Sequence, residues 1–417
     1  MAVGVTSSTS GLAFVNYMKD ISESLNQQSK GRLLCKKTKP WTGQYLEWRL
    51  HVARTSGIGF AEDGGQFSIP GKQSYQSPKA YRRAVQGKIQ LTDMAMAAIK
   101  NDKNSAKGVV NSEMEGLMRD ILKFENWYFF RDGSGNVATV KANYDVGDTD
   151  LVEVDDSRGM WEGSELDLYT AGGVFRSTLP SVSSIASLAV DDYAQVDLSG
   201  AGNADMIATD VLKWKGATSS NAVSGLMSLI DDTAGTFQNV SVTSYPKYAS
   251  LVMGNSGTAR ELTPSLFRSV LAGIQQKCGN ESPASGLTCL TSLWDAVSVE
   301  EMYEGELRLS PKDKVVGLAV KSFQTMLGKV DVVTDADAPM GTMFFADFSQ
   351  IYRGVQKPLE WRRDGNSGDG GSGAIFKRND ESGVYTATVL EIYEHFIKER
   401  HSSGRLDDLS YSRSTVY

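Results

Sequence analysis

The chain has 417 residues, of which 41% are apolar and 22% charged, a composition typical of folded globular proteins and not of disordered ones. This length predicts two or three domains, because a single compact core does not grow this large. A formal net charge of −7 argues against a protein that grips nucleic acid over its whole surface.

The cysteines, the histidines and the apolar runs exclude further classes of protein. Three cysteines without a CxxC pair predict reduced, buried or incidental thiols in a cytosolic setting, and no two of the three histidines have helical metal-ligand spacing. The N-terminus lacks the basic region of a signal peptide, and no apolar run approaches the roughly 20 residues of a membrane helix. We expect a soluble, unexported protein with no cofactor, metal or membrane partner.

Charge is divided along the chain. Residues 30–92 hold twelve basic and three acidic side chains, whereas residues 143–211 hold fourteen acidic and two basic ones. Two oppositely charged patches favour head-to-tail contact between copies, and repeated contact of this kind builds rings or shells. The alternative is that both stretches are ordinary solvated surface.

The N-terminal 43 residues read as an arm. Residues 1–10 are small and polar, residues 11–28 have the apolar spacing of a short amphipathic helix, and a basic tract follows. The tract, Lys36, Lys37 and Lys39, could touch nucleic acid through phosphates or dock on the acidic surface of a neighbour. We favour the protein partner.

Two alternating segments predict an extended hairpin. In residues 45–53 the apolar side chains alternate with polar ones, and residues 84–91 repeat this pattern, so each segment is expected to be a strand with one buried face. About thirty Gly-rich polar residues separate them. An isolated two-stranded ribbon is marginal in water, and long loops are usually functional. We therefore expect this ribbon to find its support on another molecule.

Helices and a β-rich segment follow. Thr92 can cap a short helix through Lys100, and Ser105 or Ser112 can start a long helix through Arg131, roughly 39 Å in length, that packs along a sheet. Gly133 is expected to end it. Residues 137–215 show short β runs separated by turn residues, which predicts an inserted acidic β domain, either a small barrel or a sandwich.

The C-terminal half reads as mixed α/β. Thr263 and Pro264 start a helix that Gly279 stops, and Thr291 caps another helix that runs to Tyr303. Strands are expected over 287–290, 315–320, 330–333, 343–348 and 384–397, a flexible loop over 364–373, and a polar tail at the end.

Candidate chemistry is sparse. Asp335 and Asp337 could be paired carboxylates, but no nearby histidine or nucleophile completes a catalytic set, so a turn at the end of a strand explains them better. The segment Asp364–Asp369 faintly resembles a calcium loop, yet the twelfth position is Ile375 where a bidentate glutamate is required. Cys278 and Cys289 are expected to be core thiols.

The order of these elements resembles the major capsid protein of tailed bacteriophages, with the fold of the Hong Kong 97 phage capsid that encapsulin shells and herpesvirus capsid floors share. The resemblance lies in TDMAMAAIKND, SEMEGLMRDILKFENWYFF, DGSG, SYPKYASLVM, LTPSLFRSVLAGIQ, LTCLTSLWDAV and GKVDVVTDADAPMGTMFFADFSQIYRG. It implies an α+β fold with an N-terminal arm, an extended loop (E-loop), a spine helix, and peripheral and axial domains, plus the small β-barrel-like insert. The implied divisions are 1–43 (arm), 44–91 (loop), 92–136 (spine helix region), 137–215 (insert), 216–400 (axial domain and remainder of the peripheral domain) and 401–417 (tail).

The resemblance implies a structural protein without catalysis, which self-assembles into the icosahedral head around the double-stranded DNA of a phage. Its partners would be copies of itself in hexamers and pentamers, portal, scaffolding and decoration proteins, and DNA held by weak non-specific contact. Its place would be the virion, after assembly in the host cytoplasm. The residues expected at contacts between subunits are Lys36, Lys37, Lys39, Trp41, Trp48, Lys72, Tyr75, Lys79, Arg82 and Arg83. Reversing the charge of Arg82 and Arg83 together is expected to give folded, unassembled protein.

Three alternatives remain open. Some relatives cross-link a loop lysine to a neighbouring asparagine, but nothing in the sequence supplies the desolvated environment that Lys72 or Lys79 would need. An encapsulin-type compartment would share the fold and enclose a cargo enzyme. A soluble sugar-binding or polysaccharide-acting protein could use Tyr169, Trp161 and Trp214 to stack on sugars, although core packing is the more ordinary use of such rings.

Overall fold

The computed structural model describes residues 31–60, 62–65, 69–92, 105–141, 151–188, 194–199, 206–279, 286–304, 322–325, 328–362, 375–379 and 383–410. Four expected elements fall outside this part of the chain. They are the helices over 11–28 and 92–100 (apart from Thr92, which ends a strand), the strand over 315–320 and the loop over 364–373.

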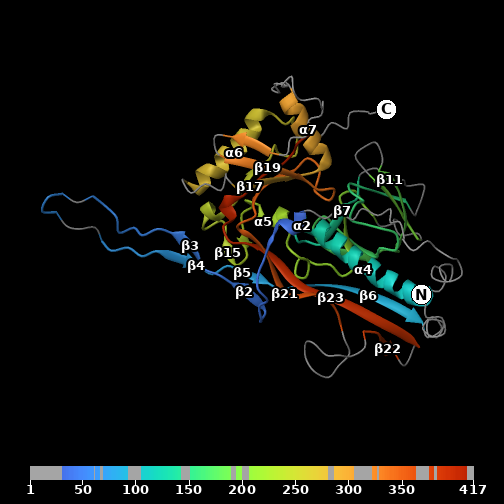
Figure 1. The fold of residues 1–417 in the computed structure, drawn as a ribbon. Coiled ribbons are helices and arrows are strands. Elements are labelled where there is room, and N and C mark those ends of the chain that lie inside the picture. The colour runs from blue at the N-terminus through green and yellow to red at the C-terminus, as the bar shows by residue number, and fades with distance from the viewer. Residues whose placement is uncertain are drawn as a thin grey trace, which may run out of the picture.

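Helices and strands form a mixed body from which a long two-stranded ribbon projects, so the expected α+β class is confirmed (Figure 1). Three long strands, β6 (Arg83–Thr92), β21 (Ile351–Trp361) and β23 (Val384–Ile397), form the antiparallel centre of one sheet. The short strand β22 (Lys377–Asn379) extends this sheet, and β1 (Lys36–Lys37) pairs parallel with β21 at its edge.

The long helix α4 (Ser105–Phe129) lies along this sheet, as the single apolar stripe of its sequence predicts. Helix and sheet approach closely at Gly87, where an added Cβ would lie 2.9 Å from Ile121 and 3.0 Å from Leu117. The helix ends two residues before Arg131, the expected end, because the amides of Phe130 and Arg131 bond to carbonyls only three residues back. This tighter turn is how many helices terminate.

The ribbon differs from the expected hairpin. Its strands are β2 (Tyr45–Glu47) paired with β5 (Lys79–Tyr81), and β3 (Leu50–Ala53) paired with β4 (Ser74–Gln76). The expectation that 84–91 forms its second strand is therefore wrong. That segment lies within β6, which pairs with β23 over its whole length and buries Val85, Ile89 and Leu91. An alternating strand goes where its apolar face is buried, and the body offers more burial than the ribbon.

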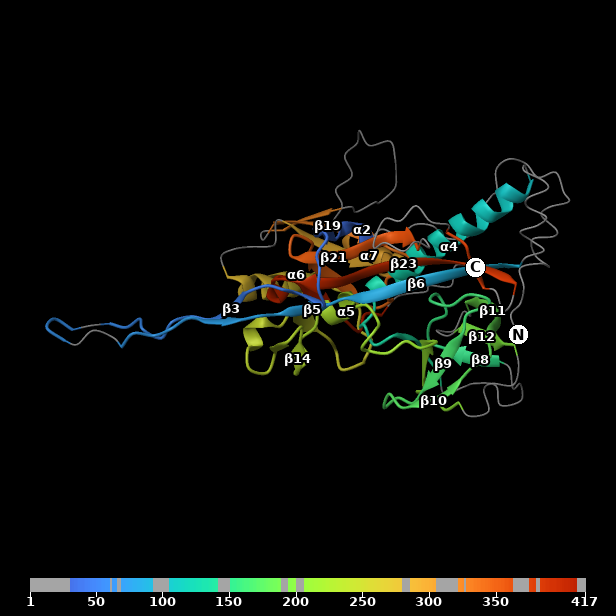
Figure 2. The same ribbon diagram turned by 90° about the horizontal axis from the view of Figure 1, so that it is seen from below.

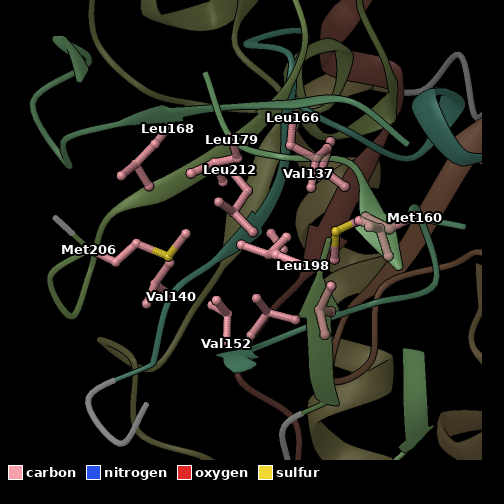
Figure 3. Close-up of a cluster of buried hydrophobic side chains, with 14 residues drawn as sticks. Val137, Val140, Val152, Met160, Leu166, Leu168, Leu179, Leu198, Met206 and Leu212 are labelled. Atoms are coloured by element: carbon pink, nitrogen blue, oxygen red, sulfur yellow. The ribbon is translucent and has the colours of Figure 1, made fainter. Parts of the chain in front are cut away.

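The insert consists of two small sheets around one core, with strand orders β10-β9-β13-β7 and β11-β12-β8 (Figure 3). Its strands are β7 (Asn136–Thr139), β8 (Leu151–Val154), β9 (Leu166–Tyr169), β10 (Phe175–Thr178), β11 (Val182–Leu188), β12 (Ala194–Leu198) and β13 (Val211–Trp214). A bridge between Val140 and Val154 joins the two sheets, so the core is closed on one side by backbone pairing. Alternating apolar residues from both sheets fill the interior, as expected for a small β domain.

A six-stranded sheet with two helices forms the other lobe (Figure 1). In spatial order it contains β16 (Leu251–Met253), β24 (Gly404–Leu406), β20 (Met343–Asp347), β17 (Leu287–Thr291), β19 (Gly328–Thr334) and β18 (Ser322–Thr325). The expectation of a polar tail from 401 onward is wrong for β24, which lies inside the sheet with Leu406 buried. A three-residue strand is too short to reveal itself by periodicity.

The two helices of this lobe are α6 (Pro264–Cys278) and α7 (Leu293–Glu304). The predicted ends of α6 are confirmed, because Thr263 accepts a hydrogen bond from the amide of Leu266 and Gly279 follows with a positive φ. The cap of α7 is Ser292 and not Thr291, which belongs to β17. The remaining short elements are α2 (Gly31–Leu34), α5 (Leu226–Leu229), β14 (Thr236–Phe237), β15 (Val240–Ser241), η1 (Pro246–Tyr248) and η3 (Arg400–Ser402).

Candidate functional site

The ribbon extends away from the body in both views, with its tip far from the rest of the chain (Figures 1 and 2). Near the tip the two strands of the ribbon touch, since a Cβ added to Gly57 would lie 2.5 Å from the amide nitrogen of Gly71. Only glycine allows so close a backbone approach. Beyond this narrow point three large apolar side chains face solvent: Ile58 and Ile69 are 83% and 85% exposed, and Phe60 is fully exposed.

The sequence did not lead us to expect these three exposed apolar residues, because the segment reads as a polar loop. Large apolar side chains scattered singly over a surface are ordinary, but three at the end of one projection are a local patch. The available signal was the group of large apolar residues, Ile58, Phe60, Phe67 and Ile69, within a segment rich in glycine and polar residues.

The predicted contact residues of the ribbon lie mostly on its surface. Lys72 is exposed, and Tyr75 is half-exposed with its ring 5.1 Å from that of His51 across the β3–β4 pair. Lys79 lies 3.9 Å from the carboxylate of Glu47, a contact in solvent that stabilises little. The exposed side chains of the ribbon are thus available to a neighbour.

Two tryptophans expected to anchor a neighbour are half-buried in their own subunit. The ring of Trp48 packs on Phe396 of β23, with 4.9 Å between centroids. The indole N–H groups of Trp41 and Trp48 are buried and have no hydrogen-bond partner among the described residues. Trp48 therefore fixes the root of the ribbon to its own sheet.

The neighbours Arg82 and Arg83 differ in environment. Arg82 is exposed, whereas the guanidinium of Arg83 lies 3.2 Å from the carboxylate of Glu394, a residue of β23 that is almost fully buried. Reversing the charge of Arg83 would place two carboxylates together in a buried site, which destabilises the fold. We therefore expect the double reversal to destabilise the subunit, contrary to the sequence-based expectation. Reversal at Arg82 alone changes only the surface charge.

The basic tract lies at the edge of the long sheet. Lys36 and Lys37 form β1 with exposed side chains, and Nζ of Lys36 donates a 3.3 Å hydrogen bond to the carbonyl of Ser349. Lys39 follows in an exposed loop. All three charges face solvent at one edge of the subunit.

Where the arm meets the body, a buried ion cluster holds it. Arg32 of α2 lies 2.6 Å from Glu125 of α4, and Arg353 of β21 lies 2.9 Å from the same carboxylate and 2.6 Å from Glu391 of β23. Burial raises the pKa of Glu125 to about 8, and a hydrogen bond with Glu391 adds to this, against the opposing charges of Arg353 and Arg32. The cluster joins the arm, the long helix and the sheet, and the sequence analysis did not foresee it.

Asp335 and Asp337 form a second joint beside this cluster. Both are buried in the turn after β19, which confirms the turn and gives it a structural role. Asn126 donates to Asp335 at 3.1 Å and to Asp337 at 2.6 Å, and Lys123 forms an ion pair with Asp337. The amide of Gly31 donates to Asp335 at 2.9 Å. The carboxylates therefore fasten the helix and the arm to the other lobe.

Part of the negative charge of the insert is paired with arginines of the same subunit. Asp156 lies 2.9 Å from Arg158 and 3.0 Å from Arg131, and Asp210 lies 3.3 Å from Arg176. The acidic patch expected from the sequence is accordingly smaller than the count of acids suggests. Exposed carboxylates remain at Glu162 and Glu165, on the side of the insert next to Trp161.

The rings considered for sugar binding mostly pack. Trp161 and Trp214 lie 4.6 Å apart, and both contact Phe124 of α4. Tyr169 pairs edge-on with Phe175 at 5.5 Å, and Lys213 lies over it. Joining the insert to the long helix is the main use of the tryptophans, as expected for core packing.

Other site classes find no support in the part of the chain that the structure describes. Within those residues no cluster of three potential metal ligands occurs. Searching the same residues finds no helix long and apolar enough to span a membrane. Cys35, Cys278 and Cys289 are free, and burial raises the pKa of Cys35 to about 12 and that of Cys278 to about 11, which keeps them protonated.

The long helix and the arm are fastened to a sheet, and the ribbon extends away from the body, an arrangement suited to the subunit of a protein shell. The SU10 major capsid protein family matches residues 204–377. Together with the solved structures below, this match shows that the chain has the fold of the major capsid proteins of tailed bacteriophages.

Solved structures agree on the fold at low sequence identity. The capsid asymmetric unit of cyanophage A-1(L) matches with a TM-score of 0.59 and 12% identity, covering 95% of this chain and 97% of that one. The capsid of a native GTA particle matches with a TM-score of 0.51 and 9% identity, covering 98% and 100%. No curated protein matches the chain.

Proposed function

We propose that copies of this chain assemble as hexamers and pentamers into an icosahedral head that encloses double-stranded DNA. The observation that carries the proposal is the projecting ribbon with its exposed apolar tip. Leaving three large apolar side chains in water is unfavourable, and a neighbouring subunit can bury them. The ribbon would lie across one adjacent subunit, and the arm would reach another.

The charged surfaces would orient these contacts. Basic side chains line the ribbon and the edge at Lys36, Lys37 and Lys39, while Glu162 and Glu165 are exposed on the insert. Exposed pairs of this kind guide encounter and register more than they add affinity. The extended loop that makes the contact comprises residues 44–82, shorter than the 44–91 expected, because β6 belongs to the body.

Other partners follow from the same proposal. The portal, scaffolding and decoration proteins of a phage head would bind the assembled shell, and the DNA inside would make weak, non-specific phosphate contacts. The chain would act without catalysis, and its assembly would take place in the host cytoplasm. The lysines of the basic edge could face a neighbour or the DNA, and we favour the neighbour.

A deletion of the ribbon tip tests the proposal. Because Gly57 and Gly71 already touch, removing residues 58–70 and joining the two glycines should leave the body folded. The full chain should form megadalton particles in size-exclusion chromatography and negative-stain microscopy, and the deleted chain should run as a monomer slightly smaller than the 45.3 kDa of the full chain. Particles of normal yield from the deleted chain would contradict the proposal.

Two controls separate the alternatives. Arg82→Glu, at an exposed position, should lower particle yield without altering the circular dichroism of the subunit. Nucleic acid inside particles isolated from infected cells supports the phage head, and a cargo enzyme would support the encapsulin alternative. A full-length chain that stays monomeric at high concentration would favour the sugar-binding alternative.

A further inference from the structure

An aromatic groove lies in the body of the subunit, where the start of β6, the second half of α4 and the insert meet. It encloses about 420 Å³, and its walls include Leu117, Ile121, Phe124, Trp161 and Trp214. Trp161 is partly exposed at its mouth. A concave, mostly apolar surface of this kind is typical of a binding site, and its size suits one or two large side chains.

One residue of the groove wall, Trp214, also carries an unsatisfied polar group. The indole N–H of Trp214 is buried and has no hydrogen-bond partner among the described residues. Leaving such a donor unpaired costs free energy, and a backbone carbonyl of an entering segment would satisfy it. The groove is thus suited to an apolar side chain followed by extended backbone.

The tip of the ribbon has the matching chemistry. Ile58, Phe60 and Ile69 project from a narrow stem, and in the described part of the chain no apolar side chain covers them, since the stem points away from the body. A ribbon that points away from its own groove can enter only the groove of another molecule. The apolar tip and the groove therefore occur at different places on the same chain, which favours head-to-tail contact between copies.

Charges flanking the two surfaces are complementary as well. The stem below the tip carries exposed Arg54 and Lys72, and exposed Glu162 and Glu165 follow Trp161 of the groove wall in the sequence. Glu165 pairs with Lys215 at 2.7 Å in solvent, a weak contact that an incoming cation can share.

We propose that the ribbon tip of one copy inserts Phe60, flanked by Ile58 and Ile69, into the groove between α4 and the insert of a second copy. This inference rests on the proposed shell function and names the surface that receives the ribbon. The insert then has a role in assembly, because Trp161 and Trp214 form one wall of the receiving site. Phe60 is the anchor, since a buried aromatic side chain at the centre of a contact dominates binding.

Photo-cross-linking tests the pairing directly. The full-length chain carries a benzophenone amino acid in place of Phe60, and particles are assembled from a mixture of isotope-labelled and unlabelled chains. After irradiation, mass spectrometry should find cross-links between differently labelled chains, at Leu117–Tyr128, Trp161 or Trp214–Val223. Cross-links to the exposed residues of α7, Leu293, Trp294 and Val297, or to any other surface, would overturn the groove assignment.

A matched pair of variants tests the energetics. Phe60→Asp should lower particle yield at least about tenfold, because a charge replaces the anchor that the groove desolvates. Val174→Asp, at another exposed apolar position, should leave the yield unchanged. Equal particle yields from Phe60→Asp and Val174→Asp would overturn the groove assignment but leave the proposed shell function standing. A wild-type chain that forms no particles would overturn both.

Discussion

The side-chain amide of Asn126 donates a 2.6 Å hydrogen bond to the carboxylate of Asp337, two buried residues separated by more than 200 positions. The same amide reaches Asp335 at 3.1 Å. One residue of the long helix thus satisfies two carboxylates in the turn after β19. A buried network of this kind stabilises one arrangement of two lobes only while all of its members are present.

Replacing Asn126 with alanine should destabilise the unassembled subunit by about 1–3 kcal/mol, since two buried carboxylates lose a donor. Chemical denaturation of the two proteins measures the difference. The control is Glu115→Ala, which removes a solvent-exposed pair with Arg119 on the same helix and should change stability by less than about 0.5 kcal/mol. Similar effects of the two substitutions would contradict a structural role for the Asn126 network.

Alanine substitutions at two glycines near the contact of α4 with the sheet should change the stability of the subunit in opposite directions. Gly87→Ala should destabilise by about 1–3 kcal/mol, because the new methyl group meets Ile121 and Leu117 at 3.0 Å or less. Gly116→Ala should stabilise by about 0.5–1 kcal/mol, since nothing lies within 4 Å and alanine favours the helix. Thermal unfolding of the two variants and the wild type measures these changes in stability. Changes of the same sign in both variants would show that the helix and the sheet are not packed as described.

The arm root should loosen when its ion cluster is broken. In Arg32→Ala the buried Glu125 loses one of two cationic partners, so α2 and β1 should detach more often from the sheet. Hydrogen exchange of the amides at 36–38 should then quicken at least about tenfold, a change of 1.4 kcal/mol in local opening. Lys39→Ala, at an exposed position next to the same strand, should leave that exchange unaltered. Unchanged protection in Arg32→Ala would show that the cluster does not hold the arm.

His395 should make the subunit sensitive to acid. Burial lowers the pKa of His395 to about 3, the charge of Arg353 adds to this, and Nδ1 lies 2.9 Å from the carbonyl of Ser224. Below pH 6.5 the unfolded chain binds a proton that the folded chain refuses, so stability falls as pH decreases from 6.5 towards 3. The slope is about 1.4 kcal/mol for each pH unit.

The variant His395→Phe keeps a ring and removes this titration, so the unfolding free energy of the wild type relative to that of the variant should fall as pH decreases through that window. Two neighbouring carboxyls act in the opposite direction, because burial raises the pKa of Glu125 to about 8 and that of Glu394 to about 7. They are present in both proteins and cancel in the difference. A constant difference between pH 3.5 and 6.5 would refute a neutral buried His395.

Patterns that repeat over several residues were readable before the structure. The alternation over 84–91 gave β6, the apolar stripe after Ser105 gave α4, and the Thr263–Pro264 pair gave the start of α6. These signals are local, because side-chain direction within one element follows from backbone geometry alone. The ordered succession of such elements was also enough to indicate the capsid family.

The partners of those elements were decided only by the tertiary structure. Strand β6 joins β23, almost 300 residues later, and the ion cluster gathers Arg32, Glu125, Arg353 and Glu391 from four separate segments. Burial in the folded body selects such pairings, and a sequence pattern carries no record of which distant surface will supply it. For the same reason the apolar tip and its aromatic groove became visible only when the chain was folded: exposure and concavity are properties of the whole molecule.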